Sequence, residues 1–73
     1  MNSQILELIQ SFESDSNKPK EKFDQFLMHV HFTFDKRIRS IKTDKTKDKY
    51  KKIKNNILQY IAIHKREIIK QLR

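Results

Sequence analysis

Lysine and arginine are the residues of this sequence whose types and spacing point most directly to chemistry. Ten of the 17 basic residues lie between Lys36 and Lys54 against two acids, so this stretch carries +8, equal to the net charge of the whole chain. Residues 1–35 carry three Lys against six acids, and residues 55–73 carry four bases against one acid. Such a concentrated positive field attracts polyanions, which include nucleic acids and acidic protein surfaces.

The spacing of these basic residues suits a row of phosphates. On a helix, Lys45, Lys49 and Lys52 recur at intervals of three and four residues, which places neighbouring ammonium groups about 5–6 Å apart, close to the spacing of phosphates along a strand. Asn56, Arg66 and Lys70 continue this face of the same helix. The residues that we expect to bind a nucleic acid or an acidic partner are Lys36, Arg39, Lys42, Lys45, Lys49, Lys52, Arg66 and Lys70.

The residue types also indicate the mode of contact. Thirteen of the basic residues are Lys and four are Arg, and it is Arg that grips phosphate or guanine in two places, so sequence-independent phosphate contact is favoured over base reading. Single-strand binding stacks bases on exposed rings, yet Tyr50 is the one aromatic residue within the basic stretch. We therefore expect contact with a duplex backbone. The alternative is a solvated face that only carries charge.

Other chemistries find little support in the sequence. There is no Cys, and His29 and His31 differ by about 160° on a helix, so no set of zinc ligands is indicated. His64 falls within an apolar stripe and is expected to be a hydrogen-bonded core residue. No glycine-rich phosphate loop or nucleophile motif is present. We expect neither a metal nor a cofactor, and we expect no enzymatic activity.

Two helices are predicted in the first half of the chain. Ile5, Leu8 and Phe12 define an amphipathic helix near 3–14, and residues 14–17 form a loop. Pro19 suits the first turn of a second helix near 20–42, whose apolar residues recur every three or four positions from Phe23 onward. A strand is the rival for residues 28–34, where apolar and polar residues alternate, but this alternation is shorter than the helical pattern.

A third helix is predicted near 45–72, from a stripe that runs from Tyr50 to Leu72. No Gly or Pro separates it from the second helix, so one continuous helix is an alternative. The two apolar stripes differ in phase by about 120–180°, which favours a break at residues 43–46 with Thr43 or Asp44 as N-cap. We predict a single all-α domain over 1–73: a short N-terminal helix and a long antiparallel hairpin. The continuous helix remains open for an oligomer.

Some apolar residues exceed what this core needs. A chain of this length has a small core and often gains burial by association. The residues expected to form an apolar partner or dimer surface are Met28, Phe32, Leu58, Ile63 and Ile69. Two hairpins could pair into a four-helix bundle, so we expect a homo-oligomer.

Together these features predict a small accessory or regulatory protein that binds DNA or RNA through phosphate contacts. The alternative is an inhibitor or adaptor, for example one encoded by a phage or mobile element, that docks on an acidic host protein. Residues 1–15 carry acids where a signal peptide carries bases, and no membrane-spanning stretch is visible. We expect a cytoplasmic protein without membrane contact.

Overall fold

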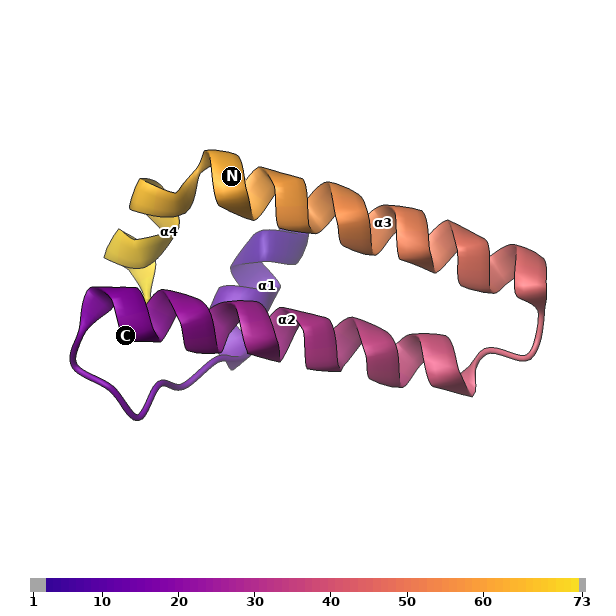
Figure 1. Ribbon diagram of the computed structural model, residues 1–73, viewed down its shortest axis with the longest axis horizontal. Coiled ribbons are helices and arrows are strands. Elements are labelled where there is room, and N and C mark those ends of the chain that lie inside the picture. The colour runs from indigo at the N-terminus through magenta and orange to yellow at the C-terminus, as the bar shows by residue number, and fades with distance from the viewer. Residues whose placement is uncertain (1–2, 73) are drawn as a thin grey trace.

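The computed structural model describes residues 3–72, and within them every regular element is a helix (Figure 1). The four helices are α1 (Ser3–Ser11), α2 (Pro19–Ser40), α3 (Asp44–Ile63) and α4 (Lys65–Gln71). The predicted all-α class is therefore confirmed, with four helices in place of three. The strand alternative for residues 28–34 is wrong, because this segment lies in the middle of α2.

The N-terminal part follows the predicted pattern with shorter boundaries. Helix α1 ends at Ser11, three residues before the expected end, and it buries Ile5 and Leu8. Pro19 is the first residue of α2, where a missing N–H breaks no helical hydrogen bond. The loop between the two helices is held by Gln25, whose side-chain oxygen accepts hydrogen bonds from the Ser14 hydroxyl at 2.7 Å and the Asp15 backbone N–H at 3.3 Å.

Helices α2 and α3 run in opposite directions side by side, joined by residues 41–43 (Figure 1). The turn closes α2 with a hydrogen bond from the Ile41 N–H to the Ile38 carbonyl at 3.2 Å. Thr43 is the N-cap of α3, but its side chain makes no capping hydrogen bond. The chain is thus not one continuous helix here, and the break lies about two residues before the predicted one.

The prediction of a single helix from 45 to 72 is wrong, because the chain bends at His64. This residue has φ −102° and ψ 28°, outside helical geometry, and α4 then folds toward the start of α2 (Figure 1). Lys54 lies beside Asp35, so at 1.5 Å per residue a straight helix would pass the start of α2 at about residue 70 and leave Leu72 beyond it. The bend instead buries Ile68 and Leu72.

The core occupies one end of the hairpin. Its buried residues come from all four helices and their ends: Ile5, Leu8, Phe12, Phe23, Phe26, Val30, Phe34, Ile57, Ile61, Ile68 and Leu72. At its centre, Phe12 meets the fully buried Phe26 edge to face, with ring centroids 5.4 Å apart. No buried residue lies between 35 and 56. The molecule measures 40 × 22 × 17 Å, and the end where α2 joins α3 extends beyond the core.

Two isoleucines on either side of the bend provide a test of which side chains the core buries. Ile68→Ala removes a fully buried side chain and should lower the free energy of unfolding by about 2–5 kcal/mol. Ile63→Ala changes a side chain that is 78% exposed and should cost less than about 0.5 kcal/mol. Urea unfolding followed by circular dichroism measures both. Equal losses would contradict the burial of Ile68 in the core and the exposure of Ile63.

Candidate nucleic-acid interface

Most of the predicted basic residues meet at the end where α2 joins α3. We call residues 36–52 the basic tip; they comprise the last turns of α2, the connection and the first turns of α3. The tip brings together six predicted binding residues, all exposed: Lys36, Arg39, Lys42, Lys45, Lys49 and Lys52. The last turns of α2 and the first turns of α3, which carry these residues, lie together at one end of the molecule (Figure 1).

The cations of α3 form a row on one face of the helix. Lys45, Lys49 and Lys52 line a shallow depression that continues to Ile53 and Asn56. Because they are three and four residues apart, their ammonium groups project about one helical turn from one another. The row is therefore long enough to follow several phosphates of one strand.

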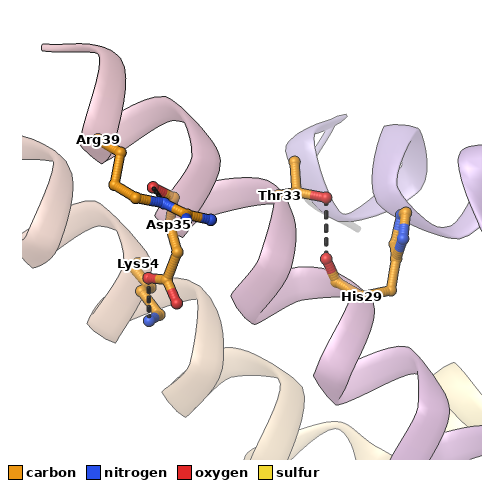
Figure 2. A network of polar contacts seen from close by, with 5 residues as sticks. All are labelled: His29, Thr33, Asp35, Arg39 and Lys54. Carbon is orange, nitrogen blue, oxygen red and sulfur yellow. Dashed lines mark hydrogen bonds and ion pairs between the residues drawn. The ribbon is translucent and has the colours of Figure 1, made fainter.

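These cations are free to bind an anion. Within residues 3–72, side-chain ion pairs involve Lys18, Lys54 and His64, and none of the six cations named for the tip. Arg39 makes one weak internal contact, in which its Nε donates to the Asp35 backbone carbonyl at 3.4 Å (Figure 2). The other guanidinium nitrogens remain available for an external partner.

Lys54 has a different role from its neighbours in the basic stretch. Its Nζ donates to Oδ1 of Asp35 at 2.8 Å, and its side chain is only 17% exposed (Figure 2). This ion pair joins α3 to α2 at the point where the core ends and the tip begins. Lys54 therefore fastens the tip to the core and does not contribute to the exposed row.

The same contact shifts the titration of Asp35. The pKa of its carboxyl lies below the ordinary value of 3.8, chiefly because Lys54 donates a hydrogen bond to the ionised form. Desolvation acts against this hydrogen bond, and the charges of Lys54, His31 and Arg39 add to the lowering of the pKa. The carboxylate therefore stays ionised, and the ion pair stays intact, below the pH at which a free Asp is protonated.

Arg66 and Lys70 are exposed but lie apart from the tip. Both are on α4, at the opposite end of the molecule (Figure 1). The prediction that they extend the row of α3 assumed a straight helix, and the bend at His64 makes that assumption wrong. The candidate interface is accordingly limited to the six cations of the tip.

The five apolar residues predicted as a partner surface fall into two groups. Met28 and Phe32 of α2 are 72% and 63% exposed and lie one turn apart, and Ile63 at the end of α3 is exposed as well. Leu58 and Ile69 are half-buried and pack against the core. Sequence analysis missed Leu6, which is 38% exposed, because its position in the stripe of α1 resembles that of a core residue.

The three histidines make local contacts. His29 Nε2 lies 3.2 Å from the Ser11 hydroxyl, and the His29 ring packs against Phe12. His64 is half-exposed, packs on Tyr60 with ring centroids 4.2 Å apart, and has its Nδ1 3.8 Å from Glu67. Within residues 3–72 no three His, Asp or Glu side chains gather as a potential metal site. Nor is any helix in this range long and apolar enough to span a bilayer.

Comparison of the chain with protein-family models, with curated proteins and with solved structures finds no match. Functional inference therefore rests on the geometry and charge of the chain itself.

The start of α3 combines three destabilising features. It lacks a side-chain cap, its first turns carry Lys45, Lys47 and Lys49 near the positive end of the helix dipole, and its first buried residue is Ile57. Asp44 is the one acid in the first turn. Local opening of this segment should therefore cost less free energy than opening of the core.

Hydrogen exchange can measure this difference. We expect the amides of residues 48–53 to exchange at least about tenfold faster than those of residues 58–61, although both segments are helical. The comparison avoids the first turn of α3, whose amides lack helical partners in any case. Equal protection of the two segments would contradict a loosely held tip.

The Asp35 to Lys54 ion pair predicts a pH dependence of stability. Because the folded-state pKa of Asp35 is depressed, its contribution is fully present above pH 3.8 and is lost as pH falls through the lower folded-state pKa. Asp35→Asn removes the charge with little change in shape. The melting temperature of the wild type should exceed that of D35N by a constant amount above pH 3.8 and approach it below.

Lys54→Ala serves as the companion variant, since it removes the other partner of the same ion pair. Without Lys54 the pKa of Asp35 is no longer lowered by this contact. The difference in melting temperature between Lys54→Ala and D35N should therefore lack the pH-dependent part that is seen between the wild type and D35N. If the difference in melting temperature between the wild type and D35N stays constant down to the lowest pH, the ion pair does not stabilise the fold.

Proposed function

We propose that this protein is a non-enzymatic accessory or regulatory factor that binds duplex nucleic acid through phosphate contacts from the basic tip. The observation that carries the proposal is the meeting of six exposed cations, none of them in an ion pair within residues 3–72, at one end of the molecule. A duplex backbone offers a dense array of phosphates to such a cluster, and release of its counterions supplies the driving force.

Two features of the tip favour a duplex backbone over a single strand or specific bases. Tyr50, its one aromatic residue, is half-buried, so no ring is fully exposed there for base stacking. Five of the six cations are Lys, which act as point charges without bidentate geometry. Binding should thus depend weakly on sequence.

Phosphate binding also offsets the electrostatic conflict at the start of α3. Lysines near the positive end of a helix dipole repel one another and the dipole, and a bound polyanion neutralises both terms. Binding and local ordering of the tip should accordingly reinforce each other. We place this function in the cytoplasm, as expected for a factor that meets nucleic acid.

Fluorescence anisotropy with labelled duplex DNA, duplex RNA and a single strand tests the proposal. The duplex should bind at about 50 mM salt and lose affinity steeply by about 200 mM, with the logarithm of affinity linear in the logarithm of salt concentration. Lys49→Ala removes one cation from the middle of the row and should reduce the salt slope by about one. Its effect should be nearly equal for different duplex sequences.

Lys70→Ala is the matched control, because Lys70 is also an exposed helical lysine but lies on α4 away from the tip. It should leave the salt slope within error of the wild type. A duplex that fails to bind at the lower salt would refute the proposal. The tip would then be assigned to an acidic protein partner, in keeping with an inhibitor or adaptor, and affinity capture with the tip variants as controls would follow.

A further inference from the structure

The solvent face of α2 carries an ordered stripe of side chains that the fold does not use. Its members lie within an arc of about 120° opposite the core and are all exposed: Glu21, Asp24, Met28, Phe32, Lys36 and Arg39. Along the helix they read as two acids, two large apolar residues and two bases. Asp35, which lies in the same arc, is paired with Lys54 of α3. An exposed Phe and Met one turn apart form an apolar patch typical of an interaction site.

The order of these residues makes the stripe complementary to itself in reverse. We infer that α2 packs antiparallel against α2 of a second copy of this chain. With the two-fold axis at the level of Val30, Met28 faces Phe32 of the second copy. Asp24 then faces Lys36, and Glu21 faces Arg39. All three pairs share the same midpoint, so one register satisfies them together, as an isologous interface requires.

The side chains of the central pairs are available for this contact. Neither Asp24 nor Lys36 has an ion-pair partner within residues 3–72. Phe32 borders a shallow groove that also includes His29, Thr33 and Lys36, into which an apolar side chain of the second copy can insert. Glu21 already accepts a hydrogen bond from Ser16 and lies 3.9 Å from Lys18, so its pair with Arg39 is the weakest of the three.

Charge complementarity selects a second copy over other partners. A uniformly acidic helix would match Lys36 and Arg39 but meet Glu21 and Asp24 with like charge, and a basic helix would do the reverse. A partner must reverse the order of acids and bases along its length, which an antiparallel α2 does. Like charges placed opposite each other are strongly disfavoured, so this order also sets the direction of packing.

The net charge of +8 on each chain opposes association, but its effect is limited. Most of the excess lies in the basic tips, which the antiparallel arrangement sends to opposite ends of the dimer. At about 150 mM salt, the screening length of about 8 Å is much shorter than the separation of the tips. A single helix face makes a small interface, so the dissociation constant should be on the order of micromolar or weaker.

Charge reversal with exchange of partners tests both the dimer and its register. Sedimentation equilibrium at about 150 mM salt, over about 10 µM to 1 mM protein, should show the wild type in a monomer–dimer equilibrium. Asp24→Lys and Lys36→Asp should each raise the dissociation constant by at least about tenfold, because each places like charges opposite one another twice. Combining the two changes in one chain should restore dimers. Mixing the two single variants should give a heterodimer in which both pairs attract.

A second pair of variants tests the apolar centre. Phe32→Asp should abolish the dimer, whereas Ile63→Asp, which changes an even more exposed apolar residue outside the stripe, should not. Circular dichroism confirms that each variant is folded. A wild type that stays monomeric to about 1 mM overturns the inference, as do dimers that ignore Phe32→Asp or single reversals that do not rescue each other. These measurements contain no nucleic acid, so their outcome is independent of the proposed function.

Discussion

The packing of α1 against the middle of α2, and of α4 against its start, is the interaction on which the rest of the structure depends. Phe26 and Ile68 are fully buried, and Phe12 closes the contact between α1 and α2. A chain this short has few apolar side chains to bury. The eleven that are buried within residues 3–72 all lie at one end of the α2–α3 pair. The short helices cover that end, and the long ones extend past it.

This distribution of burial explains the position of the basic tip. Beyond Phe34 of α2 and before Ile57 of α3, the two helices contact each other only through half-buried side chains and the ion pair of Asp35 with Lys54. Without a core to cover, these turns can expose most of their residues and carry a high charge density. The same absence of burial makes them the least stable part of the helical structure. The high charge density and the low local stability that we expect of the tip thus have one physical cause.

Much of this arrangement is visible in the sequence, and the parts that are not have a common reason. Local sequence patterns indicate three of its features: the periodicities of α1 and α2, Pro19 at a helix start, and the change of phase before Tyr50. The bend at His64 leaves no such signal, because Ile57, Ile61, Ile68 and Leu72 keep helical spacing across it. It results from the finite length of α2, a tertiary property. The position of Arg66 and Lys70 was mispredicted for the same reason.

The tip shows the same division between local and tertiary information. Clustering of cations on consecutive helices could be predicted, since both the charge count and the turn are local features. The role of Lys54 could not, because sequence does not give the register of α2 against α3 that brings it to Asp35. Likewise, the exposed stripe of α2 can be recognised in the sequence only after the structure shows which apolar face of this helix packs in the core.

The proposed dimer fixes the separation of the two basic tips, and this separation can be compared with the dimensions of a duplex. In an antiparallel α2 pair centred at Val30, each α2 ends at Ser40, ten residues from the two-fold axis. The two helix ends are therefore roughly 30 Å apart along the helix direction, with Lys42 just beyond each end. One turn of B-form DNA is about 34–36 Å, the spacing at which dimeric proteins contact successive groove positions on one face of a duplex. The dimer would also engage Lys36 and Arg39 near its own interface, leaving Lys42, Lys45, Lys49 and Lys52 as the phosphate contacts of each tip. Two weak, sequence-independent tips held at the helical repeat would bind a duplex more tightly than either alone, since the second contact forms at high effective concentration. Self-association would then supply the affinity that a single cluster of lysines lacks.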